Sequence, residues 1–142
     1  MNVSARNVFK GKITALTDGV VNAEIELTLP GGDRIVAIVT ETSVKSLGLA
    51  LGGEAVAYVK APWVMLLSGQ PDVHFSARNQ LSGKVSALTK GAVNTEVAIT
   101  LAGGSVVHSV VTNEAVLELG LKLGEPATAL IKASHVILGV PG

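Results

Sequence analysis

Two short segments of the chain carry the same set of hydrogen-bond donors. Ser4-Ala5-Arg6 recurs unchanged as Ser76-Ala77-Arg78, and a later Lys-Ala pair also occurs twice, as Lys60-Ala61 and Lys132-Ala133. Each set offers a hydroxyl, a guanidinium, an ammonium and the N–H groups of small residues, and its two cationic groups can only donate. Such a set suits a compact oxyanion that accepts hydrogen bonds on every side. The pattern therefore predicts two oxyanion sites of one kind.

Thr40 adds a further hydroxyl at the start of a predicted helix, and Thr112 holds the equivalent place in the second copy. Free N–H groups and the positive end of the helix dipole favour an anion at such a position. A structural role is the alternative, in which Arg6 pairs with Glu24 and Lys60 lines a solvated edge. From spacing alone this alternative is favoured, because structural ion pairs are common.

The donors recur because the whole chain is duplicated. A shift of 72 positions aligns residues 4–67 with residues 76–139 without a gap, and roughly half of the aligned positions are identical. The segment between the copies, Ser68 to Phe75, contains Gly69 and Pro71 and is typical of a linker. The chain is therefore expected to hold two domains, at 1–67 and 76–142, joined by a linker at 68–75.

Each copy is expected to consist mainly of strands. In the first copy the strand-like segments are 8–16, 20–29, 34–40, 54–60 and 63–67, and turns are expected at Asp18-Gly19 and Pro30-Gly31-Gly32. Within residues 20–29, the apolar residues Ala23, Ile25 and Leu27 alternate with polar ones and share one face.

One short helix is expected between residues 40 and 48 of the first copy. Val44 and Leu47 are three positions apart, Thr40 or Thr42 can cap the start, and Gly48 can end the helix. Five short strands and one helix in each copy favour two tandem OB-like, five-stranded barrels.

The combined motifs SARNxxxGK, GxVNxE, VT before the helix and the closing KA resemble the Mop domain of the molbindin family. The resemblance covers nearly the whole chain, and the chain is most similar to the two-domain, ModG-type arrangement of this family. It implies an OB-like fold, binding of molybdate or tungstate at interfaces between domains, and assembly of six Mop domains from three such chains. It also implies a role in intracellular molybdenum storage and homeostasis, with no covalent cofactor and with the metal bound only as an oxyanion.

The resemblance also assigns site residues. The family's oxyanion set matches Ser4, Ala5, Arg6, Lys60 and Ala61 in the first copy and Ser76, Ala77, Arg78, Lys132 and Ala133 in the second. Thr40 and Thr112 match a threonine that a neighbouring domain supplies. A second class of site, near a three-fold axis, is placed at Val21-Asn22 and Val93-Asn94. Pro62 follows the first Lys-Ala pair where Ser134 follows the second, and proline has no N–H, so the two sites are expected to differ in strength.

The composition favours a soluble, cytoplasmic protein that associates with itself. The net charge is zero, so the chain has no general field for a membrane or a nucleic acid, and the absence of cysteine excludes disulfides and zinc thiolate sites. No apolar run approaches the roughly 20 residues of a membrane helix. Residues are 48% hydrophobic and 15% charged, which indicates that apolar surface is buried between subunits. Together with the resemblance, this predicts a homotrimer.

Catalysis is not expected. His74, His108 and His135 have no counterparts in the other copy, and residues 81–85 lack the first glycine and the Ser or Thr of a phosphate-binding loop. The alternative function is an OB-type module for nucleic acid or another small anion. Strand binders stack bases on aromatic rings, yet Leu81, Leu130 and His135 replace Phe9, Tyr58 and Trp63 in the second copy, so no nucleic-acid partner is expected.

Overall fold

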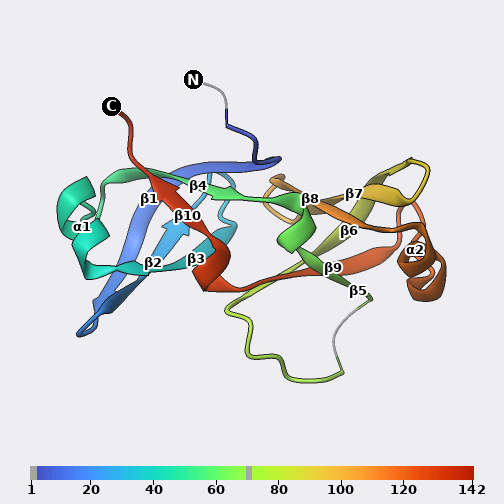
Figure 1. The fold of residues 1–142 in the computed structure, drawn as a ribbon, viewed down its shortest axis with the longest axis horizontal. Helices are drawn as coiled ribbons and strands as arrows, with labels where there is room; N and C mark the ends of the chain where they lie inside the picture. The colour runs from blue at the N-terminus through green and yellow to red at the C-terminus, as the bar shows by residue number, and fades with distance from the viewer. Residues whose placement is uncertain (1–2, 70–71) are drawn as a thin grey trace.

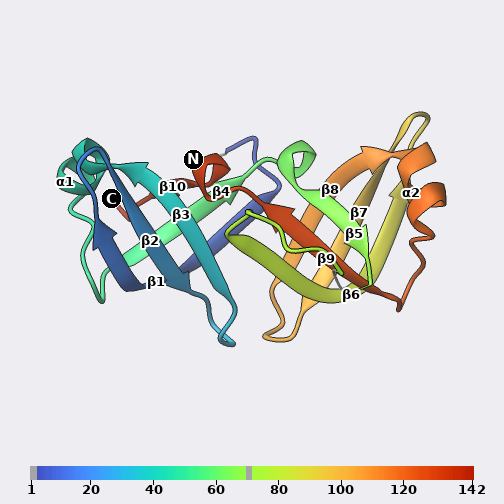
Figure 2. The same cartoon turned by 90° about the horizontal axis from the view of Figure 1, so that it is seen from below.

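The protein consists mainly of two curled five-stranded β-sheets that lie side by side (Figures 1 and 2). The computed structural model describes residues 3–69 and 72–142. The first copy provides β1 (Asn7–Asp18), β2 (Asn22–Thr28), β3 (Arg34–Thr40), α1 (Glu41–Leu47), β4 (Glu54–Val59), the 3-10 turn η1 (Ala61–Trp63) and β5 (Met65–Ser68). The second provides β6 (Asn79–Lys90), β7 (Asn94–Leu101), β8 (Val106–Thr112), α2 (Asn113–Leu119), β9 (Pro126–Ile131), η2 (Ala133–His135) and β10 (Ile137–Gly139). The predicted fold class, mainly β with one short helix per copy, is confirmed.

The two copies exchange their fifth strands. The strand order is β10-β4-β1-β2-β3 in the first sheet and β5-β9-β6-β7-β8 in the second. In the first sheet Ile137 lies opposite Tyr58, and in the second Met65 lies opposite Leu130. Each sheet therefore has four strands from one copy and the fifth from the other, where we expected five strands from a single copy. Figure 1 shows β4 leading through η1 to β5 in the other sheet.

The region between β4 and β5 also corrects a predicted boundary. Trp63 was expected to start a strand, but it lies in η1, and the strand begins at Met65. Pro62 stands near the start of this 3-10 turn, where proline's fixed φ and missing N–H cost little. The predicted linker overlaps β5 at Ser68, and its Pro71 lies outside the described residues. The domain boundaries at 1–67 and 76–142 stay a prediction.

The alternation predicted for the second strand is confirmed. Ala23, Ile25 and Leu27 of β2 are buried, and the residues between them are more exposed. Because side chains of a strand alternate between its two faces, one apolar face covers the core while the other meets solvent. The buried side chains of both sheets join in one core, with Ile35 and Ile99 among its fully buried members.

The helix ends follow the predicted capping residues. Thr40, and not Thr42, caps α1, because its side chain accepts a hydrogen bond of 3.1 Å from the Ser43 N–H. Gly48 ends the helix at φ 65°, in the left-handed region that favours glycine. Thr112 caps α2 in the same way, with a 3.1 Å bond from the Ala115 N–H.

The tips of the β2–β3 and β7–β8 hairpins touch at the junction of the two sheets. A Cβ at Gly31 would lie 2.1 Å from the Gly103 carbonyl oxygen, so only glycine allows this approach. Asp33 Oδ1 accepts a 3.1 Å hydrogen bond from the Gly103 N–H across the junction. Since Gly31 and Gly103 are equivalent residues of the two copies, the sheets are related by an approximate two-fold axis.

Candidate functional site

The repeated Ser-Ala-Arg-Asn segment joins each copy to the other through its asparagine. Asn7 Nδ2 donates to the His108 carbonyl at 2.8 Å, and its Oδ1 accepts from the His108 N–H at 2.7 Å. Asn79 makes the same pair of bonds with the Val36 carbonyl and N–H, both at 2.7 Å. The two asparagines are only 1% and 2% exposed. Each one therefore ties the start of its own β1 or β6 to the edge strand of the other sheet.

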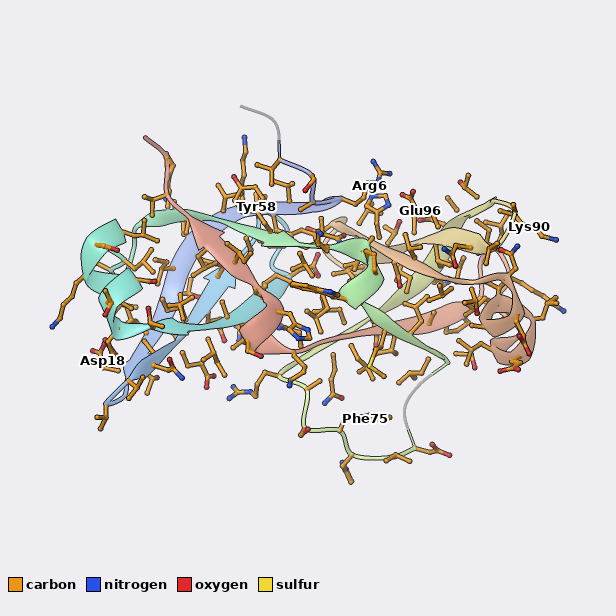
Figure 3. The ribbon with its side chains drawn as sticks, viewed as in Figure 1. Arg6, Asp18, Tyr58, Phe75, Lys90 and Glu96 are labelled. Atoms are coloured by element: carbon orange, nitrogen blue, oxygen red, sulfur yellow. The ribbon has the colours of Figure 1, made fainter. Side chains whose placement is uncertain are left out.

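The repeated arginines also cross to the other copy. Arg6 Nε donates to Glu96 Oε1 at 3.1 Å, and Arg78 Nη1 donates to Glu24 Oε2 at 2.7 Å. Figure 3 shows Arg6 directed toward Glu96. The expected structural alternative, Arg6 with Glu24, is thus wrong in its partner, because the glutamate comes from the opposite sheet. His108 Nδ1 lies 3.2 Å from the same Glu96 Oε1, whereas Val36 stands at the equivalent position beside Glu24.

The predicted donors of the second copy meet in one pocket of about 410 Å³. Ser76, Ala77 and Arg78 come from the segment before β6, and Lys132 and Ala133 from the start of η2. The backbone makes this possible because β9 ends at Ile131 and the 3-10 turn bends the chain there. Ser134, Ile38, Met65, Phe75, Leu130, Trp63 and His135 also line the pocket. All five assigned residues of the second copy are therefore brought together.

The first copy has an equivalent pocket of about 560 Å³ that collects fewer of its predicted donors. Ser4, Ala5 and Lys60 line it, next to Tyr58 and to residues 137–140 of the exchanged strand and its continuation. Ala61 is 1% exposed and Arg6 is turned toward Glu96, and neither lines this pocket. The first set is therefore only partly assembled.

The two pockets lie on either side of an aromatic contact. The rings of Trp63 and His135 have centroids 4.9 Å apart and are tilted by 41°, and both residues line both pockets. These are equivalent positions in η1 and η2, so the contact lies close to the approximate two-fold axis. The pair forms the wall between the two candidate sites.

The threonines expected at these sites lie elsewhere in the chain. Thr40 precedes α1 and Thr112 precedes α2, and these helices occupy opposite ends of the molecule in Figure 1. Neither threonine lines either pocket. The positions assigned to the second class of site lie beside them instead, because Asn22 is opposite Thr40 and the Val21 carbonyl accepts from the Glu41 N–H at 2.8 Å.

The second copy repeats this grouping at the other end of the molecule. Asn94 lies opposite Thr112, and the Val93 carbonyl accepts from the Asn113 N–H at 2.8 Å. Val21 and Val93 are 67% and 69% exposed. Within one chain, therefore, Thr40 and Thr112 belong with the second class of positions and not with the arginines.

The sequence analysis assigned no role at the site to Asn7, Asn79 or Glu96, and it named Glu24 only as a structural partner of Arg6. The signal was present, since all four recur in the two copies. Their partners could not be read from the sequence because each contact joins opposite copies. Among the described residues no group of three or more His, Cys, Asp or Glu could hold a metal cation, and no helix is long and apolar enough to cross a membrane.

A family model described as the TOBE domain matches the chain twice, at residues 3–66 and 76–138. The molybdenum-pterin-binding protein MopA of Rhodobacter capsulatus is 45% identical over 141 residues, which are 99% of this chain and 53% of that protein. The molybdenum transport protein ModE of Azotobacter vinelandii is 42% identical over 100% of this chain and 52% of its own length. The chain thus spans about half the length of these curated relatives.

A solved structure matches the chain over its full length. The cytoplasmic molybdate-binding protein ModG, solved with molybdate bound, superposes with a TM-score of 0.94 at 56% identity, covering 99% of this chain and 100% of that chain. Molybdenum-pterin-binding protein 2 of Clostridium pasteurianum is 46% identical over 68 residues, which are 48% of this chain and the whole of that protein. One copy therefore corresponds to a complete protein in that relative.

Proposed function

This chain belongs to the TOBE domain family in the tandem two-domain form of ModG, and we propose that it binds molybdate or tungstate as an oxyanion. The observation that carries the proposal is the full-length match to a structure solved with molybdate bound. The two donor pockets supply the chemistry. The proposed ligand residues are those assigned from the sequence; Lys60 lines the first pocket, and Lys132 and Arg78 line the second.

The second pocket is suited to a fully ionised tetrahedral anion. The guanidinium of Arg78 and the ammonium of Lys132 donate hydrogen bonds and cannot accept them. A molybdate dianion presents acceptors to both groups, whereas phosphate at neutral pH is partly protonated and needs an acceptor for its proton. Molybdate and tungstate are therefore expected to bind more tightly than phosphate, and the chain is expected to bind them without catalysis.

We propose that the working form is a homotrimer, in which three chains complete one another's sites. Thr40 and Thr112 are separated from the donor pockets within one chain, so a neighbouring chain would have to supply them. Both ends of the molecule expose apolar side chains suited to subunit contact, including Val20 at 98% and Leu117 at 82% exposure. Storage of molybdenum in the cytoplasm is the role that this arrangement supports best.

Calorimetric titration of molybdate into the full chain tests the proposal. The wild type should bind molybdate and tungstate, with weaker binding of phosphate. The double variant Lys60→Ala/Lys132→Ala should lose most of this affinity, because both pockets lose an ammonium that can contact the anion. Lys90→Ala/Lys122→Ala is the matched control, since both of these lysines are exposed and line neither pocket. No binding by the wild type, or equal loss in the control, would refute the assignment.

A further inference from the structure

We propose that Asn7 and Asn79 are positioning residues for the oxyanion sites, an inference that rests on the proposed function. Each asparagine follows directly after the Ser-Ala-Arg donors and fixes the place of that segment on the opposite sheet. The repeated tetrapeptide then has two parts, three residues assigned to the anion and one that holds them in place.

The bonds of each asparagine reproduce one rung of a β-ladder. Val36 belongs to β3 and lies opposite Glu26 of β2, and His108 belongs to β8 and lies opposite Ala98 of β7. Both β3 and β8 are at the edges of their sheets. Alternate residues of an edge strand direct their N–H and C=O groups away from the sheet, where they need partners. An asparagine amide presents one donor and one acceptor, and here it satisfies both backbone groups at 2.7–2.8 Å.

The donor segments have few other contacts of their own. In the second copy the Gln80 side chain donates to the Phe75 and Ala77 carbonyls at 3.1 Å, and Val8 at the equivalent position of the first copy has no such group. Ser76 to Arg78 precede β6 and Ser4 to Arg6 precede β1, so neither segment takes part in the strand ladders. Asn7 and Asn79 are the first residues of these strands and are almost fully buried. The ion pairs of the preceding arginines are half exposed, and exposed pairs hold geometry weakly. The backbone of each asparagine is set in its own sheet, where Asn7 lies opposite Val59 and Asn79 lies opposite Ile131. The buried amide is the contact that fixes the start of the donor segment against the opposite sheet.

Other side chains cannot replace this arrangement. Aspartate has two acceptors and no donor, and serine or threonine offers a single oxygen on a shorter arm. Removal of the amide would leave the Val36 N–H and C=O without partners in a buried place. The donor segment would then be free to shift. Because anion binding depends on donors fixed at short distances, a shift would weaken binding even though every ligand residue remained.

Ser109 provides a matched control for a purely structural effect. Its Oγ donates to the Val64 carbonyl at 2.6 Å, again between the two copies, and the residue is 1% exposed. The equivalent residue of the first copy is Ala37, so alanine fits this position. Ser109→Ala removes a buried bond between the copies without touching the donor segment.

The test compares Asn79→Ala with Ser109→Ala in two backgrounds. In Lys60→Ala only the second pocket keeps its lysine, and in Lys132→Ala only the first pocket does. Molybdate titration should show that Asn79→Ala weakens binding about tenfold or more in the Lys60→Ala background, the loss of about one charge-assisted hydrogen bond. It should have little effect in the Lys132→Ala background. Ser109→Ala should lower the melting temperature in both backgrounds and leave the affinity unchanged.

Three outcomes would overturn the positioning role. Asn79→Ala could leave affinity unchanged, it could weaken binding equally in both backgrounds, or Ser109→Ala could weaken binding as much. If Asn79→Ala does not fold, Asn79→Ser keeps an oxygen at this position and is subject to the same comparison. Failure of the wild type to bind molybdate would instead refute the proposed function, so the two failures are distinguishable.

Discussion

The two donor pockets share the contacts that join the copies, but they differ in the residues that line them. In both copies an asparagine bonds the opposite edge strand and an arginine crosses to the opposite glutamate. In the second pocket Arg78 still lines the cavity while it contacts Glu24. In the first, Arg6 is directed to Glu96 and does not line the cavity.

The residues beside the two glutamates also differ between the copies. Glu96 has His108 at 3.2 Å as a second partner, whereas the copy around Glu24 has Val36 in the corresponding place. The surroundings of Glu96 and Glu24 therefore differ between the two copies, in step with the different positions of Arg6 and Arg78. Both copies keep the residues that join the sheets, Asn7 with Asn79 and Arg6 with Arg78, whereas the residues that line each pocket differ.

Arg78→Ala should change the molybdate affinities of the two pockets the most. The second pocket loses a guanidinium, and a hydrogen bond to a charged group is worth about 1.5–3 kcal/mol. Loss of one such bond should lower its molybdate affinity by roughly ten- to a hundred-fold, and loss of a second would lower it further. Arg6→Ala should weaken the first pocket less, because Arg6 is directed to Glu96 and does not line that cavity. Lysine should not fully rescue the loss at Arg78, because the planar fork is lost. Calorimetry resolves the two classes of site.

Arg34→Ala is the control for Arg78→Ala, since Arg34 is 69% exposed and lines neither pocket. Melting of the ligand-free proteins should change little. The Arg78–Glu24 pair is largely solvated, with side chains 52% and 35% exposed, and such pairs contribute about 0–1 kcal/mol to stability. Unchanged affinity together with a clearly lower melting temperature would show that Arg78 only holds Glu24.

Ser134→Pro should make the second pocket resemble the first. The substitution removes a hydroxyl and an N–H at the wall of the pocket, and the affinity should fall by about tenfold if one charge-assisted bond is lost. Proline fits here because Lys132 (φ −66°, ψ 132°) and Lys60 (φ −70°, ψ 134°) start their 3-10 turns alike, and Pro62 already occupies the other turn. Ser134→Ala, which keeps the N–H, separates the two contributions. A molybdate titration that gives the same affinity for all three proteins would contradict a role for Ser134.

Glu96→Gln should have the smallest effect on molybdate affinity, and it should raise the affinity where the other variants lower it. Removal of the carboxylate releases Arg6 and takes away a negative charge near the first pocket. Two unit charges about 4 Å apart in water interact by about 1 kcal/mol, which corresponds to roughly five-fold tighter binding. Raising the salt concentration should reduce this gain. Glu118→Gln is the control at an exposed position on α2, and an equal gain in the control would show that Glu96 acts only through net charge.

Local structure was predictable where one residue decides it. Thr40 and Gly48 marked the helix ends because a hydroxyl cap and a left-handed glycine act within a few residues of themselves. The buried face of β2 followed from its alternation. The 3-10 turn at Ala61–Trp63 was missed, although Pro62 marks it, because the apolar residues around it have the composition of a strand.

The exchange of strands was not predictable from the sequence. Met65 and Ile137 are equivalent residues, and they pair with the equivalent residues Leu130 and Tyr58. Either fifth strand can therefore pair with either sheet, and no local signal in the sequence favours one pairing. The same symmetry hid the partners of Asn7 and Arg6. The sequence predicted the candidate site residues as one set. That Thr40 and Thr112 lie apart from the two donor pockets depends on these long-range contacts.

The exchanged strands set the order in which the chain can finish folding. A protein emerges from the ribosome from its N-terminus, and its N-terminal domain usually folds first. Here β10 is synthesised after every other described strand, yet it completes the sheet that begins with β1. Until then the edge of β4 from Val56 to Tyr58 lacks its native partner on that side, and an open edge is where strands associate wrongly. Of the two sheets, the one that contains β1 is therefore begun first and completed last.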